Sequence, residues 1–159
     1  MHLKKILIPF LLLASLQAQD SPWPTDAGNA YSSNFGEYRD DHFHMGLDIR
    51  TNGTIGHKVY AVEKGFISRI VTNYSGYGKA IYQKTMSGKT IVYAHLDKFN
   101  PVMERVVKLQ QSKNKKYSIT TNFSSKEFRI KKGDVIGYTG ETGYAFGPNL
   151  HFEVRDNTD

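Results

Sequence analysis

Short apolar runs separated by turn-forming residues dominate the chain. The segment KVYAVEKGFISRIVTN alternates apolar and polar positions around Val59, Ala61, Phe66 and Ile70. Alternation of this kind is typical of strands with one buried face. Further short runs read GKAIYQKT, KTIVYAHL, YSITTNF, DVIGYTG and LHFEVR, and the Ser87-Gly88 pair between the first two predicts a hairpin. The pattern therefore predicts an all-β protein, built as a sheet, sandwich or barrel.

One segment departs from this rhythm. PVMERVVKLQQ places Val102, Val106 and Leu109 near helical spacing, which predicts a short helix over residues 101–111. The expected fold is an antiparallel, sandwich-like β core with this one inserted helix. Whether the block 101–132 covers one end of a groove stays open at this stage.

The first twenty residues, MHLKKILIPFLLLASLQAQD, have the order of a secretory signal peptide. Lys4 and Lys5 precede an apolar run, and a small-residue site ends at Ala18. The run is shorter than the roughly 20 residues that a spanning helix needs; the alternatives are an uncleaved anchor or a buried helix. We expect a signal peptide over 1–18, a lead-in loop over 19–33, one domain over 34–156 and a tail over 157–159. Export would place the domain in the periplasm or outside the cell.

Composition narrows the possible partners. The 159 residues include no cysteine, which excludes disulfides, a thiolate zinc site and a lipoprotein anchor. The formal charge is +6, and residues 101–132 hold nine Lys or Arg against two Glu. That segment favours either an anionic partner, such as a wall polymer or membrane surface, or a plain solvated face. No nucleic-acid motif is present, and we expect a monomer without a stable membrane anchor.

Candidate metal chemistry gathers around two histidine segments. In DDHFHMGLD, His44 and Asp48 lie four residues apart and share a face on a strand or a helix, while Gly46 disfavours the helix. A third imidazole would complete three protein ligands with an open fourth position, the arrangement of catalytic zinc. His151 in GPNLHFEVR is the natural third ligand. Singly, each of these residues also fits a surface or core position.

Taken together and in order, these segments resemble one family. HMGLD, VYAVEKGFISRI, GYGKAIYQ, VYAHL, IKKGDVIGYTGETG and GPNLHFE are similar to the motif blocks of the lysostaphin-like (LytM-type, β-lytic) zinc endopeptidases, which cut peptidoglycan peptides. The resemblance runs from about Asn34 to Arg155. It implies a sandwich-like fold of the duplicated-hybrid-motif kind, one Zn²⁺ per chain and peptidoglycan peptides as substrate.

The resemblance also implies roles for individual residues. His44, Asp48 and His151 match the family's zinc ligands, and His95 matches one catalytic histidine. Asn149 stands where the family has its second catalytic histidine. An Asn amide can donate a hydrogen bond to an oxyanion or hold a water, but it cannot carry a proton near neutral pH.

The remaining candidates concern the groove wall. Tyr77 and Tyr93 are tentative substrate-binding residues, although Tyr in a sheet is often packing. Gly143 and Gly147 would let the backbone approach a ligand or turn sharply. Two functions follow: an active zinc endopeptidase, or a zinc-holding but catalytically weak homologue that binds peptidoglycan or regulates another wall hydrolase. In a periplasm, the cross-link between D-alanine and a diamino acid is the expected target.

Overall fold

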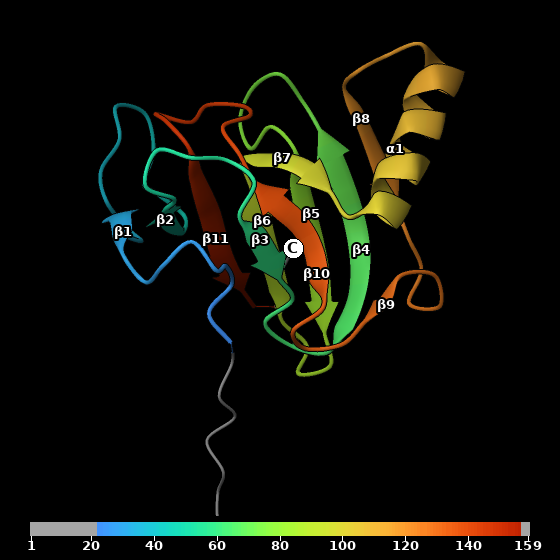
Figure 1. Ribbon diagram of the computed structural model, residues 1–159, viewed down its shortest axis with the longest axis horizontal. Helices are drawn as coiled ribbons and strands as arrows, with labels where there is room; N and C mark the ends of the chain where they lie inside the picture. The colour runs from blue at the N-terminus through green and yellow to red at the C-terminus, as the bar shows by residue number, and fades with distance from the viewer. Residues whose placement is uncertain (1–21, 157–159) are drawn as a thin grey trace, which may run out of the picture.

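The structure is a computed structural model that describes residues 22–156 (Figure 1). The predicted signal peptide (1–18) and tail (157–159) lie outside the described residues. The elements are β1 (Tyr31–Ser33), β2 (Leu47–Arg50), β3 (Lys58–Tyr60), β4 (Gly65–Thr72), β5 (Ala80–Thr85), β6 (Thr90–Ala94), β7 (Leu96–Phe99), α1 (Pro101–Asn114), β8 (Ile119–Asn122), β9 (Arg129–Ile130), β10 (Val135–Thr139) and β11 (Asn149–Arg155).

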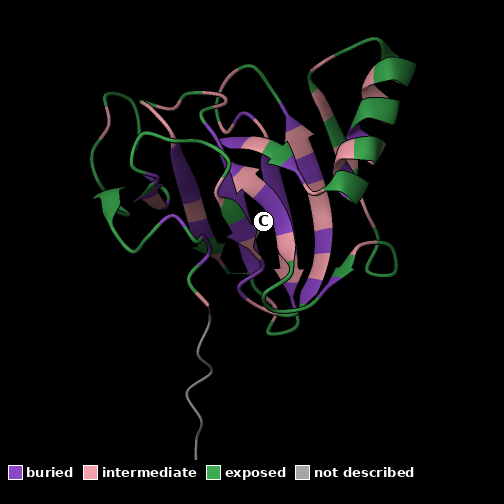
Figure 2. Cartoon of the chain, viewed as in Figure 1, coloured by how far each residue is buried: buried purple, intermediate pink, exposed green. Residues whose placement is uncertain are grey.

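The strands form two antiparallel sheets. The larger runs β1-β2-β11-β6-β5-β4-β8, with β9 paired to β4, and the smaller runs β3-β10-β7. Figure 1 shows the smaller sheet lying across one face of the larger. Apolar side chains from both sheets meet in one buried cluster, which includes Ile49, Val59, Ile81, Ile136 and Leu150, and Figure 2 shows this burial along the central strands. The predicted all-β fold with one short helix is confirmed.

The structure confirms one predicted hairpin and divides one predicted strand segment into two strands. The hairpin at Ser87-Gly88 is present between β5 and β6. The run 58–73 instead forms β3 and β4, which belong to different sheets. A bulge in β4 between Ile67 and Arg69 shifts its register against β5, so Ile67 enters the core and Phe66 is only half-buried. A bulge of this kind adds one residue and ends strict alternation.

Helix α1 has clear ends. Asn100 caps it by accepting a hydrogen bond from the Met103 amide at 3.0 Å, Pro101 follows in the first turn, and Lys115 ends it in the left-handed region at φ 51°. It is three residues longer than predicted.

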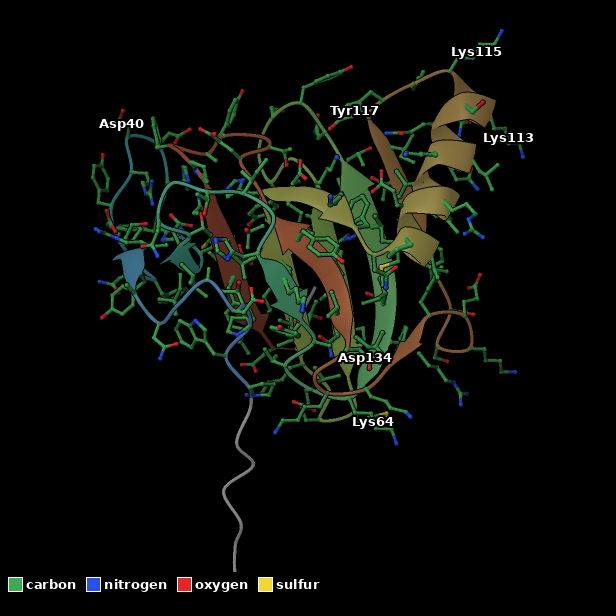
Figure 3. All side chains as sticks on the ribbon, viewed as in Figure 1. Asp40, Lys64, Lys113, Lys115, Tyr117 and Asp134 are labelled. Atoms are coloured by element: carbon green, nitrogen blue, oxygen red, sulfur yellow. The ribbon has the colours of Figure 1, made fainter. Side chains whose placement is uncertain are left out.

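The position of α1 answers the open question about the groove. It packs on β7 and β8, at the opposite edge of the large sheet from β2 and β11 (Figure 1). Figure 3 shows Lys113 and Lys115 there and Asp40 at the other side of the molecule. No residue of 101–132 lines the two cavities described below, so this block is not a lid. Within residues 22–156, no helix is long and apolar enough to cross a membrane.

Candidate metal centre and its groove

Strand β11 positions the candidate site. His151 pairs with Asp48 of β2 on one side and with Ala94 of β6 on the other. Because side chains alternate along a strand, Asn149, His151 and Glu153 share one face. Leu150 points to the core on the opposite face.

Gly46 lets the loop before β2 approach this strand. A Cβ at Gly46 would lie 2.4 Å from the Phe152 carbonyl oxygen and 3.1 Å from His151 Nε2. Any other residue would push the loop away from β11. The glycine therefore carries His44 close to His151.

Three side-chain atoms converge at this point, and we call His44, Asp48 and His151 the donor triad. His44 Nε2 lies 3.0 Å from His151 Nδ1, and Asp48 Oδ1 lies 3.2 and 2.8 Å from these two nitrogens. All three residues combine in a group that could hold a metal ion. Ligands of a tetrahedral ion bonded at about 2.0–2.2 Å lie a little over 3 Å apart, so the triangle needs only slight opening.

The outer nitrogens of both imidazoles fix the direction of their lone pairs. His44 Nδ1 lies 2.8 Å from the Asn34 carbonyl oxygen, and His151 Nε2 lies 2.7 Å from Glu153 Oε1. Since both partners are acceptors, these nitrogens carry the protons. Histidines that bind a metal commonly donate their other N–H to a carbonyl or carboxylate. When both imidazoles are neutral, their inner nitrogens face Asp48 with lone pairs, an arrangement that fits a cation.

Glu153 is held in turn by a buried network. Its side chain is fully buried and accepts hydrogen bonds from Tyr77 Oη at 2.6 Å and Arg155 Nε at 2.5 Å, besides His151. Burial alone would raise the pKa of Glu153, but these hydrogen bonds outweigh it and lower the pKa to about 2. Glu153 is therefore a permanent carboxylate behind His151.

The free triad competes for protons. Burial is the largest single influence and opposes the charge on both Asp48 and His151, but their mutual hydrogen bond, the bond of His151 to Glu153 and the surrounding charges together outweigh it. The pKa of Asp48 falls below its ordinary value and the pKa of His151 rises above it. A metal that binds here must displace a proton from His151.

His95 lies beside the triad and has a fixed tautomer. It separates β6 from β7, so VYAHL is not one strand, and its backbone is left-handed at φ 58°. Its Nδ1 lies 2.8 Å from the Thr142 carbonyl oxygen and must donate, which leaves a lone pair on Nε2. Burial lowers the pKa of His95 below the ordinary histidine value. The side chain lines the same groove as the triad.

The loop before β11 sets the orientation of the Asn149 amide. Its Nδ2 donates to the Gly147 carbonyl oxygen at 2.9 Å, which sets the orientation of the amide. Oδ1 is buried and has no hydrogen-bond partner among the described residues. The amide keeps a second N–H on Nδ2, and its atom without a partner is an acceptor.

The groove over the triad has a volume of about 570 Å³. A second cavity of about 200 Å³, which we call the side cavity, adjoins it, and the two share Arg39, Asp48, His95, Tyr144 and Phe146. Asn149 lines the side cavity and His151 the main groove. The site therefore has two compartments that meet at Asp48 and His95.

Of the four residues predicted to line the groove, one does so and three do not. Tyr77 lines the groove. Tyr93 does not: it lies in the core with its hydroxyl donating to Gln83 Oε1, so the packing alternative is correct. Gly143 packs against the backbone of Gly76 and Gly78, where a Cβ would lie within 2.3 Å of an oxygen. Neither it nor Gly147 lines either cavity.

Sequence reasoning missed Arg39. Its Nη2 donates to Asp48 Oδ2 at 3.2 Å and to Ser33 Oγ at 2.6 Å. Arg39 lies in a loop that has no regular pattern of apolar and polar residues. Its positive charge, five residues before His44, is the only sign of it in the sequence. His42 from the same loop is exposed and pairs with Asp41.

A two-sheet β fold with two buried histidines and a partly buried aspartate facing a groove defines a metallopeptidase-like domain, and comparisons with known proteins agree. The sequence model of peptidase family M23 matches residues 102–159. The chain is 32% identical over 82 residues to the DD-carboxypeptidase/endopeptidase Mpg of Neisseria meningitidis, over 52% of this chain and 14% of that protein. It is 30% identical over 116 residues to the glycyl-glycine endopeptidase ALE-1 of Staphylococcus capitis, over 72% of this chain and 25% of that protein.

The solved structures agree on the fold. The catalytic domain of lysostaphin from Staphylococcus simulans superimposes with a TM-score of 0.59 at 24% identity, over 82% of each chain. The chain thus belongs to the LytM-type peptidases of family M23. It spans a seventh to a quarter of the length of the two curated relatives.

Proposed function

We propose that this chain is a zinc metalloendopeptidase that hydrolyses peptide bonds in peptidoglycan stem peptides or cross-links. The observation that carries the proposal is the donor triad, whose three inner atoms lie 2.8–3.2 Å apart with both outer imidazole nitrogens bound to acceptors. Supporting it are the family and the endopeptidase names of the relatives.

Zinc would be held by His44, Asp48 and His151. When bound, zinc polarises a carbonyl and lowers the pKa of water to about 7. Two imidazoles and one carboxylate suit zinc better than calcium or magnesium, which prefer all-oxygen sites.

His95 is the proposed proton carrier. Its Nε2 faces the groove as a free lone pair and takes the proton of the attacking water as the water oxygen adds to the carbonyl carbon. The carbonyl π electrons move to oxygen. On collapse the C–N bond breaks, and the amine nitrogen takes the proton back from Nε2. A lowered pKa keeps His95 neutral, and therefore ready to accept, at pH 7.

A second function remains a candidate because of Asn149. An enzyme that has lost one of two catalytic histidines but kept its metal donors would be a zinc-holding module, which binds peptidoglycan or regulates another hydrolase. The unpartnered Oδ1 of Asn149 is the observation that favours it. We regard hydrolysis as the better supported function because His95 is oriented and lines the groove.

We further propose that the domain acts after export, in the periplasm or outside the cell; β1 pairs with β2, so the domain extends before the predicted start at residue 34. The residues MHLKKILIPFLLLASLQA support export, with cleavage after Ala18. The N-terminal sequence of the mature protein tests it: a first residue of Gln19 is expected.

The decisive experiment uses mature protein loaded with zinc and purified peptidoglycan. Released muropeptides are analysed with and without a chelator. Chelator-sensitive peptide cleavage is the expected result. Absence of cleavage with one zinc still bound per chain would overturn the enzyme and favour the binding module.

A further inference from the structure

Hydrolysis at this site needs a donor for the oxyanion besides the metal. Charge develops on the carbonyl oxygen during attack, and preoriented donors there are a major part of catalysis. Asn149 directs one of its two Nδ2 N–H groups to the Gly147 carbonyl oxygen, and its atom without a partner is the acceptor Oδ1. Nδ1 of His95 is engaged by Thr142, and its Nε2 is an acceptor.

Arg39 is the positive group nearest to the donor triad. It is the only lysine or arginine that lines either of the two cavities in the described part of the chain. Nη2 makes both of its hydrogen bonds, to Asp48 Oδ2 and to Ser33 Oγ. Its Nε is buried and has no partner within residues 22–156. The Arg39 side chain is 28% exposed and lines both the groove and the side cavity, so it brings a positive charge to the place where they meet.

Neighbouring contacts hold Arg39 in place. Ser33 Oγ, which accepts from Nη2, donates in turn to Glu37 Oε2 at 2.5 Å. The contact with Asp48 uses the oxygen that is not part of the triad, because Oδ1 faces the two imidazoles. Both contacts hold Nη2, and because the guanidinium is planar they also restrict the direction of its remaining N–H groups.

We propose that Arg39 forms an anion subsite beside the donor triad and binds the oxyanion of the peptide bond being cleaved. Asn149 Oδ1, which lines the side cavity, accepts the N–H of the same peptide unit. The inference rests on the proposed hydrolysis for its substrate, but the subsite itself is a binding property. Both residues line the side cavity, where a peptide unit would bring its carbonyl oxygen to a cation and its N–H to an amide oxygen that has no partner within residues 22–156.

Inorganic phosphate is the probe, because it is a small tetrahedral oxyanion that needs no turnover. Its affinity for zinc-loaded protein is measured by calorimetry for wild type, Arg39→Gln and Arg39→Lys. Arg105→Gln is the matched control, since it removes the same charge from the exposed face of α1, away from both cavities. Zinc affinity is measured for each variant by competition with a chromophoric chelator.

Arg39→Gln should weaken phosphate binding by about 10- to 100-fold, as loss of a charge-assisted hydrogen bond does, with zinc retained. The phosphate affinity of Arg39→Lys should lie between those of wild type and Arg39→Gln, because lysine keeps the positive charge but lacks the planar, forked set of N–H donors. Arg105→Gln should match wild type. Equal phosphate affinity of wild type and both Arg39 variants would overturn the subsite.

Measuring peptide hydrolysis alongside phosphate affinity distinguishes failure of the Arg39 subsite from failure of the proposed enzyme. In an active enzyme, Arg39→Gln should lower kcat by about 10²- to 10³-fold with a smaller change in KM. If zinc-loaded wild type cleaves nothing but its phosphate affinity still depends on Arg39, the subsite stands and the enzyme does not. If wild type cleaves and Arg39→Gln matches it in both phosphate affinity and kcat, the enzyme stands and the subsite is wrong.

Discussion

The two sides of the groove differ in how completely their polar side chains are hydrogen-bonded. On the metal side, every donor of the triad is present, and each imidazole is fixed from behind by a carbonyl or by buried Glu153. On the proton-transfer side, His95 is fixed by Thr142, but its counterpart is Asn149, whose Oδ1 has no partner in the described chain. One side is saturated with interactions and the other is depleted.

The difference separates holding a metal from using it. Metal affinity depends on the triad and its outer hydrogen bonds, and none of these involves Asn149. Turnover depends on proton transfer and oxyanion stabilisation, which now fall to His95 and, in our proposal, Arg39. Variants on the two sides should therefore change different measurements.

The largest effect is expected from the metal side. Asp48→Ala removes one of three donors and leaves two imidazoles facing each other, so zinc affinity should fall by more than the roughly 100-fold that loss of an outer partner costs. Peptide hydrolysis should become undetectable. Zinc per chain after dialysis and muropeptide release measure both. Asp156→Ala, at an exposed position after β11, is the control. Hydrolysis retained in Asp48→Ala would disprove the assignment of the triad.

His95→Gln should separate the two sides most cleanly. It removes the only proposed proton carrier and leaves the triad intact, so kcat should fall by about 10²- to 10⁴-fold while zinc stays bound. Steady-state kinetics on a defined cross-linked peptide, with zinc content determined in parallel, measure this. An unchanged kcat would mean that another group moves the proton.

Features that leave a pattern in the sequence could be predicted, and features that depend on contacts between loops could not. The order of motif blocks and the apolar alternation predicted the all-β fold, the helix and the residues of the triad. Sequence could not show that Tyr93 faces the core, since both faces of β6 are buried, nor that a bulge displaces Phe66. Arg39 and the orientation of the Asn149 amide depend on contacts between β11, the β1–β2 loop and the loop before β11. Such contacts leave no periodic pattern.

Glu153→Gln tests whether the metal side owes its strength to the buried network. The change removes the charge that orients His151 Nε2–H, and zinc affinity should fall by roughly 10- to 100-fold. Tyr77→Phe removes one hydrogen bond to Glu153 but keeps the carboxylate on His151, so it should cost only a few-fold. Chelator competition measures both. Equal affinity of Glu153→Gln and wild type would show that the triad is held without it.

The pH dependence should report both sides at once. Neutral His95 is the active form, and burial lowers its pKa, so kcat/KM should rise with pH and level off with a midpoint below about 6.5. His151 has a raised pKa in the free protein, so zinc affinity should also rise with pH. Zinc content is therefore measured at each pH. A midpoint above 6.5 at full zinc occupancy would contradict the assignment to His95.

The smallest effect is expected from restoring the missing histidine. Asn149→His would place an imidazole next to His95 and Arg39 at the side cavity, where it could share proton transfer. If His95 already carries the proton and Arg39 the oxyanion, the gain in kcat should be about tenfold or less, with zinc affinity unchanged. Kinetics of Asn149→His in the wild-type and Arg39→Gln backgrounds test this. A larger gain in the Arg39→Gln background would mean that the new imidazole and Arg39 serve the same oxygen. A gain of 10³-fold or more in the wild-type background would mean that Asn149 had nearly silenced the enzyme, and that the depleted side of the groove, not the metal side, limits this protein.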